Sequence, residues 1–254
     1  MTQETKYKLK SGHEVTLPLH YKNWKWMMAT FTVPAKQVQK LLPLRLKPIL
    51  ASPGKALISF GAFEYPEVSD LDPYDEFVIS IPVQYDPFVN IPFLPLFFDP
   101  LFPQIAYKKG ANYIYHLPVT TEESYKAGSE IWGFPKVVRE IKFEENEITK
   151  SCRLINKGKE VLHLEIKKVP VSKNKKDFTY CSYTKKDAQL LKTCIHANGN
   201  YGIKKIIGEA SVKFGTGEIA DEMKKLNLSK RPIHVFFAES IESALPLADE
   251  SLPN

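Results

Sequence analysis

The sequence has few cysteines, few glycines and no long apolar run, and each shortage excludes a class of protein. Its three cysteines, Cys152, Cys181 and Cys194, are an odd number without a Cys-x-x-Cys spacing. A scaffold held by disulfides is therefore not expected, and we predict reduced, buried thiols in a cytoplasmic protein. The segment from Met1 to Gly12 is polar and charged, which indicates no signal peptide.

Proline outnumbers glycine, 19 to 12, and proline disfavours long helices and central strand positions. The most apolar stretch, Phe88 to Ala106, is interrupted by prolines, so it cannot form a regular membrane-spanning helix. The net charge is +6, but the basic residues are spread along the whole chain. We expect neither a membrane nor a nucleic acid as a partner.

The common catalytic and binding motifs are also absent. The sequence contains no Gly-x-Ser-x-Gly, Walker A, Gly-x-Gly-x-x-Gly or His-Glu-x-x-His motif. Its six histidines are scattered, without the spacing of metal ligands. These patterns give no support to a metal site or to a seryl or cysteinyl nucleophile.

Alternating and β-branched residues predict one mainly antiparallel β domain with a few short helices (α+β), over residues 1–254. We expect strands at 55–65, 76–85, 112–119, 136–143, 148–155, 160–169, 189–196, 203–214 and 233–238. Asn198-Gly199 predicts a hairpin between the strands at 189–196 and 203–214. Helices are expected at 34–42, 120–132 and 218–226, the second with a capping box at Thr120-x-x-Glu123 and a stop at Gly133.

One segment combines a rigid turn with a lone lysine. Residues 128–136 read Gly-Ser-Glu-Ile-Trp-Gly-Phe-Pro-Lys, leave the capped helix and enter a strand. The sequence neighbours of Lys136 are apolar or aromatic, so its side chain either reaches water along them or loses its hydration. A dehydrated lysine favours the uncharged amine, a nucleophile that forms a Schiff base with a ketone. An ordinary surface lysine at the start of a strand fits the same pattern.

Residues 128–136 resemble the active-site segment of the acetoacetate decarboxylase family, which ends on a Schiff-base lysine. Tyr74-Asp75-Glu76 running into Ile81-Pro82-Val83 resembles the family's tyrosine and active-site glutamate before the same Ile-Pro-Val. Lys40-Leu41-Leu42-Pro43 and Gly215-Thr216-Gly217 add similarity, so the resemblance covers most of the chain from about Trp24 onward. It implies an acetoacetate decarboxylase-like β-barrel that forms a homo-oligomer and needs no cofactor or metal.

The resemblance also implies site residues. The catalytic ones are Lys136, Glu76 and Glu130, and the substrate-binding ones are Tyr74, Trp132, Phe134 and Lys25. Glu76 orients the substrate or relays a proton. Glu130 does the same or holds the local geometry, the alternative being a helix-end carboxylate bonded to backbone.

The sequence departs from the family pattern at several positions. Val137 stands where many members carry a second lysine, whose charge activates the nucleophile. Trp24 occupies the place of an arginine associated with the substrate carboxylate, and Gly61 that of a second acidic residue, with Glu64 the closest carboxylate. Residues 86–109 look like an apolar, proline-rich insertion.

Three functions remain open at this point. The leading one is a lyase that decarboxylates a β-keto acid such as acetoacetate through a lysine imine and an enamine. A Schiff-base aldolase or dehydratase acting on pyruvate-like keto acids needs the same enamine without loss of CO2. A non-catalytic β-barrel that binds a small apolar or keto ligand is the third.

Overall fold

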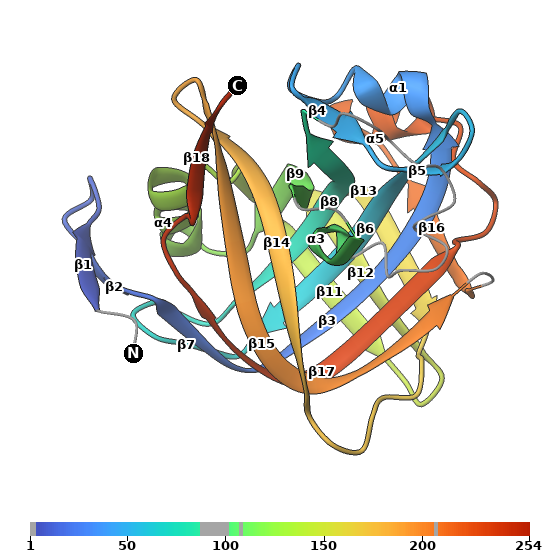
Figure 1. Cartoon of the computed structure of the whole chain (residues 1–254). Coiled ribbons are helices and arrows are strands. Elements are labelled where there is room, and N and C mark those ends of the chain that lie inside the picture. The colour runs from blue at the N-terminus through green and yellow to red at the C-terminus, as the bar shows by residue number, and fades with distance from the viewer. Residues whose placement is uncertain (1–3, 87–101, 107–108, 206–207) are drawn as a thin grey trace.

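Figure 1 shows the computed structural model, which describes residues 4–86, 102–106, 109–205 and 208–254. Within these residues, seven strands close into a barrel in which each pairs with the next and the last pairs with the first. In that order they are β9 (Gly110–Val119), β14 (Lys176–Lys186), β15 (Gln189–Lys205), β17 (His234–Leu245), β3 (Leu19–Pro34), β6 (Lys55–Tyr65) and β8 (Tyr74–Tyr85). Neighbours are antiparallel except β9 and β14, which run parallel.

A second sheet of four described strands packs against the barrel and lies behind it in Figure 1. Its strands are β11 (Glu140–Glu145), β12 (Thr149–Asn156), β13 (Lys159–Lys167) and β16 (Ala210–Phe214). The short strands are β1 (Thr5–Lys8), β2 (Glu14–Leu17), β4 (Leu46–Pro48), β5 (Leu50–Ser52), β7 (Glu67–Val68), β10 (Lys136–Val138) and β18 (Glu250–Pro253). The described helices are α1 (Ala35–Gln39), α3 (Pro103–Ala106), α4 (Glu122–Trp132) and α5 (Glu218–Lys224).

Two hydrophobic cores lie on the two sides of the barrel wall. Along β8, Phe77, Ile79 and Ile81 belong to the core shared with the second sheet, whereas Val78 belongs to the core inside the barrel. Successive side chains of a strand point to opposite faces, so both faces of β8 are buried. This is why residues 76–85 are apolar almost without interruption. Glu76 is a charged exception, and it lines the barrel interior.

The expected fold class, mainly antiparallel strands with a few short helices, is confirmed. Five strands, β6, β8, β9, β12 and β13, begin and end within two residues of the expected ranges. The single strand expected at 136–143 is wrong, because it divides at Arg139, whose backbone N–H donates to the carbonyl of Val119. The strand expected at 203–214 is also two strands, the end of β15 and β16. β3 and β14 have no counterpart among the expected ranges.

The hairpin predicted at Asn198-Gly199 is wrong, because β15 runs through these residues. The type I′ turn of a tight hairpin needs positive φ at both central residues, and neither residue has it. The register of β15 against β17 instead shifts between Asn198 and Asn200, which marks a β-bulge. A Cβ on Gly199 would lie 2.8 Å from Cγ1 of Ile241, so this glycine permits the close approach of β17.

The N-cap of the helix that precedes the lysine lies one residue later than predicted. The N-cap of α4 is Thr121, whose hydroxyl accepts a hydrogen bond from the backbone N–H of Ser124 at 3.3 Å. The hydroxyl of Thr120 instead accepts from the backbone N–H of Asp75 at 2.9 Å. Thr120 thus ties the start of this helix segment to β8 rather than capping it.

The prediction of reduced thiols is wrong for two of the three cysteines. Cys181 and Cys194 form a disulfide between β14 and β15, where they are directly paired. Their pairing follows from the register of two long strands, and β14 was not among the expected ones. Cys152 is free and buried, as predicted.

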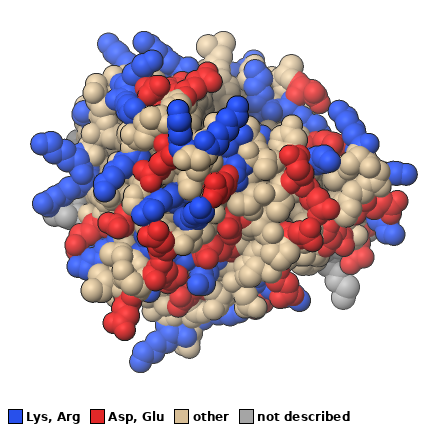
Figure 2. Space-filling model, turned by 180° about the vertical axis from the view of Figure 1, so that it is seen from behind, with Lys and Arg blue, Asp and Glu red and all other residues tan. Residues whose placement is uncertain are grey.

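Basic and acidic side chains are interspersed over the face shown in Figure 2. In the part of the chain that the structure describes, no helix has the length and apolar character needed to cross a membrane. Most of the predicted insertion at 86–109 lies outside the described residues.

Candidate active site

The barrel interior contains a cavity of about 80 Å³. Apolar and aromatic side chains form most of its wall, and Lys136 and Glu76 are the only charged residues among the described ones that line it. Pockets for drug-sized ligands measure about 300–1,000 Å³. The cavity therefore suits a molecule of only a few non-hydrogen atoms.

The turn before Lys136 is held by the end of helix α4. Gly133 has φ of 67° in the left-handed region, as at many helix ends. The last helical carbonyls receive hydrogen bonds from β14, with Lys186 Nζ 2.6 Å from the oxygen of Glu130 and Thr184 Oγ1 2.5 Å from that of Trp132. These bonds satisfy groups that a helix end leaves without partners. They also fix the direction in which the chain enters β10.

Lys136 and Glu76 form a buried ion pair. Lys136 starts β10, which pairs in parallel with β9, and Glu76 lies on β8, the other neighbour of β9. The Nζ atom of Lys136 lies 2.6 Å from Oε1 of Glu76, and their side chains are 5% and 8% exposed. Two charges so far from water depend on their mutual contact for stabilisation. The carboxylate is therefore placed to take a proton from the lysine.

The side chain of Lys136 rests on the one helical position without a Cβ. A Cβ built on Gly128 would lie 2.5 Å from Cε, 2.7 Å from Cδ and 3.0 Å from Nζ of Lys136. Gly128 also belongs to the buried face of α4. The glycine of the segment 128–136 therefore makes the room in which the lysine lies.

Three tyrosines surround the ion pair. The hydroxyls of Tyr21 and Tyr74 are hydrogen-bonded at 3.1 Å, and Tyr65 donates to Oε2 of Glu76 at 3.5 Å. Burial raises the pKa of all three phenols above its ordinary value, and the charge of Glu76 adds to this. The hydroxyls stay protonated at physiological pH and serve as hydrogen-bond donors. The ring of Tyr74 also lies 5.0 Å from Nζ of Lys136.

The structure brings five of the seven expected site residues to the cavity. Lys136, Glu76, Tyr74, Trp132 and Phe134 all line it. The ring centre of Phe134 is 5.9 Å from the lysine Nζ. The indole N–H of Trp132 donates to the carbonyl of Pro246 at 2.7 Å, so this ring is fixed as part of the wall.

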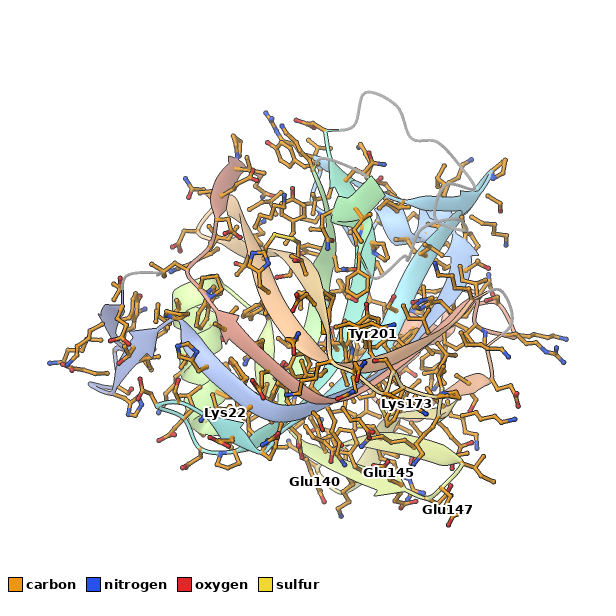
Figure 3. All side chains as sticks on the ribbon, turned by 60° about the horizontal axis from the view of Figure 1, so that its bottom comes forward. Lys22, Glu140, Glu145, Glu147, Lys173 and Tyr201 are labelled. Carbon is orange, nitrogen blue, oxygen red and sulfur yellow. A yellow bond between two sulfur atoms is a disulfide. The ribbon has the colours of Figure 1, made fainter. Side chains whose placement is uncertain are left out.

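The other two, Glu130 and Lys25, lie away from the cavity. The carboxylate of Glu130 accepts a hydrogen bond from the backbone N–H of Lys10 at 2.8 Å, which is the structural alternative considered for it. Lys25 lies between two cavity residues of β3, so strand alternation turns it outward. Its Nζ is 3.5 Å from Oε2 of Glu145, which Figure 3 labels on the second sheet.

At two positions that depart from the family pattern, Trp24 and Gly61, the described cavity residues provide no charge in place of the arginine and the second acidic residue. The indole N–H of Trp24 donates to the hydroxyl of Ser243 at 3.1 Å. Glu64 contacts the buried Lys150 of the second sheet, on the other side of the barrel wall from its neighbour Tyr65. A Cβ on Gly61 would lie 2.7 Å from Cε of Met28, so a side chain at that position has no free space.

Sequence reasoning missed the part of the cavity contributed by β3, β14 and β15. Tyr21 and Trp26 of β3, Phe178 and Tyr180 of β14 and Ala197 of β15 all line it. Trp24 and Trp26 alternate with polar residues, which is a strand pattern that could have indicated β3. Nothing local shows that these strands face Lys136, because that depends on barrel closure.

The fold and the site together define the class of protein, a closed β-barrel with a buried lysine–glutamate pair in an aromatic cavity. Residues 5–243 match the acetoacetate decarboxylase family. This match spans nearly the whole sequence, and the chain belongs to the acetoacetate decarboxylase family. Among curated proteins, none matches it.

Solved structures share the fold at low sequence identity. An acetoacetate decarboxylase from Legionella pneumophila is 16% identical with a TM-score of 0.60, and the match covers 91% of this chain and 86% of that one. Another acetoacetate decarboxylase is 14% identical with a TM-score of 0.63, covering 93% and 89%. The enduracididine biosynthesis enzyme MppR complexed with pyruvate is 13% identical with a TM-score of 0.60, covering 96% of each chain.

Proposed function

We propose that this protein is a Schiff-base lyase that decarboxylates a small β-keto acid such as acetoacetate. The observation that carries the proposal is the contact of 2.6 Å between the buried Lys136 Nζ and Glu76 inside a cavity with a mostly apolar and aromatic wall. A nucleophilic lysine needs a group that takes its proton and a site that excludes water. Glu76 is placed to take the proton, and the mostly apolar and aromatic wall limits the access of water. The family match supports the same chemistry.

The first half of the reaction joins lysine and ketone. Glu76 takes a proton from the Lys136 ammonium, and the free amine adds to the ketone carbon. Glu76 returns this proton to the hydroxyl of the resulting carbinolamine, which leaves as water and gives a protonated imine. Most side chains of the cavity wall are apolar or aromatic. They bind water weakly, so little water competes with the amine for the ketone.

The second half releases CO2. The bond between the carboxylate and the neighbouring carbon breaks, and its electron pair moves into the iminium to form a neutral enamine. Protonation of the enamine carbon regenerates an iminium, and one water hydrolyses it to the ketone product and free Lys136. The proton for the enamine carbon comes from solvent, because decarboxylation consumes one, and Glu76 at the amine is the nearest acid to relay it.

A second candidate keeps the imine but retains the carboxylate, as in an aldol or dehydration reaction on a pyruvate-like keto acid. The observation that favours it is the absence of any second cation among the described cavity residues. The structural neighbour MppR is described as complexed with pyruvate. Both candidates need the same enamine on Lys136.

Turnover separates the candidates. We expect acetoacetate to yield equal amounts of CO2 and acetone with the wild-type protein and none above background with Lys136→Ala. Lys192→Ala is the matched control, since Lys192 is also buried and paired, with Glu250 at 3.4 Å, but lies outside the cavity. Condensation of pyruvate with an aldehyde, without CO2 from acetoacetate, moves the assignment to the second candidate.

A further inference from the structure

Two buried polar groups among the described residues of the cavity wall have no hydrogen-bond partner, the hydroxyl of Tyr180 and the indole N–H of Trp26. Trp26 is 1% exposed and lines the cavity, and its indole nitrogen has no hydrogen-bond partner among the described residues. A buried donor without an acceptor is destabilising by about 1–3 kcal/mol. Such a group is retained where something else supplies the acceptor, and a bound ligand is one such source.

The two other tryptophans of the chain provide the contrast. Trp24 donates to Ser243 and Trp132 donates to the carbonyl of Pro246, and both also line the cavity. The fold thus satisfies two of three indole N–H groups around one small space. Trp26 is held rigidly, with its ring stacked on Phe63 at 5.3 Å and packed on Phe236 at 4.4 Å.

The charges of the cavity indicate what Trp26 would bind. Lys136 is its only cation among the described lining residues, and that cation is already paired with Glu76. A substrate carboxylate that enters must therefore be held by neutral donors. An indole N–H donates and cannot accept, so it selects an oxygen acceptor over an amine or an apolar group.

We propose that the indole N–H of Trp26 binds the carboxylate of the substrate and is the specificity-determining group for acidic carbonyl compounds. The inference rests on the proposed function for the identity of the substrate class. It assigns the ketone end of the molecule to Lys136 and the acid end to Trp26. The cavity of about 80 Å³ keeps both groups within reach of one small molecule.

Nitrogen–proton correlation spectra of the wild-type protein test this directly. The chain has three tryptophans, so it gives three indole N–H signals, and Trp26→Phe assigns one of them. The probes are butyrate, which has the carboxylate but no ketone, and 2-pentanone, which has the ketone but no carboxylate. We expect butyrate to shift the Trp26 signal downfield and to leave the Trp24 and Trp132 signals nearly in place.

Binding constants of the same two probes provide the second readout. In Trp26→Phe we expect the Kd of butyrate to rise about 10-fold and the Kd of 2-pentanone to change less than 2-fold. Trp24→Phe is the matched control, since it removes an indole whose hydrogen bond is already satisfied, and it should leave the ratio of the two constants unchanged. Thermal unfolding of each variant checks that the fold is retained.

Butyrate forms no imine, so this experiment is independent of the lysine chemistry. If acetoacetate is not turned over but butyrate shifts the Trp26 signal, the proposed function fails and the inference stands. Equal weakening of both probes in Trp26→Phe assigns a packing role to Trp26 and overturns the inference. Absence of butyrate binding, or binding that leaves the Trp26 signal unmoved, overturns it as well.

Discussion

Substituting Gly128 by alanine should separate the stability of the protein from its activity. The new Cβ would lie 2.5 Å from Cε of Lys136, while carbon atoms in ordinary contact are about 3.5 Å apart. The lysine side chain must therefore move by roughly 1 Å. A misplacement of that size lowers the rate by about 100-fold.

The effect on folding runs the other way. Glycine inside a helix is less favourable than alanine by about 0.5–1 kcal/mol, and Gly128 lies inside α4. The atoms that must shift are the far end of a flexible side chain beside a cavity. We therefore expect the free energy of unfolding of Gly128→Ala to stay within about 1 kcal/mol of the wild-type value.

Two measurements on Gly128→Ala test this reasoning. Urea denaturation gives the stability, and the initial rate of CO2 release from acetoacetate gives the activity. As a control, Gly128→Ala in the Lys136→Ala background has no lysine to displace, so the helix preference alone should stabilise it by about 0.5–1 kcal/mol. Full activity in Gly128→Ala would refute the placement of the lysine against this glycine.

Two further predictions concern stability, and a third concerns the disulfide. Glu76→Ala leaves Lys136 buried without its partner, so the free energy of unfolding at pH 7 should fall by about 3–5 kcal/mol. Glu67→Ala is the control, because it breaks only the exposed pair with Lys22 and should change the free energy of unfolding little. A small loss in Glu76→Ala contradicts the buried pair. Burial and the nearby Arg139 lower the pKa of His116 from 6.5 to about 4. Between these two pH values the unfolded chain binds a proton that the folded protein does not. The free energy of unfolding contributed by neutral His116, which is fully present above pH 6.5, therefore declines by about 3 kcal/mol toward pH 4. Urea denaturation at pH 7 and pH 4.5 should show this decline reduced in His116→Gln, and an unchanged decline disproves the assignment. Denatured, unreduced protein should expose one reactive thiol, Cys152, and three after reduction, because Cys181 and Cys194 are joined; three thiols before reduction exclude the disulfide.

The reactive end of the site could be predicted because its determinants are local. The helix stop at Gly133, the turn and Lys136 follow one another within four residues, so no long-range pairing is needed to place them. Helical periodicity also explains why Glu130 does not line the cavity. The buried face of α4 contains Ser124, Ala127, Gly128 and Ile131, which are spaced by three and four residues, and Glu130 falls off this face.

The remainder of the cavity depends on which strands become neighbours. Tyr21 and Trp26 line the same cavity as Lys136 only because β3 belongs to the closed barrel and β10 pairs with its strand β9. The same long-range pairing joins Cys181 to Cys194, and it overrides the turn preference of Asn198-Gly199. Local propensity does not contain this information, since side-chain packing across strands decides it.

Chemical trapping on Lys136 tests the central claim most directly. The protein is incubated with acetoacetate and reduced with borohydride, and its peptides are mapped by mass spectrometry. We predict a reduced adduct on Lys136, with Lys150 and Lys192, the other buried lysines of the described residues, left unmodified. An unmodified Lys136, or an adduct spread equally over the three lysines, would contradict the assignment of this residue as the Schiff-base nucleophile.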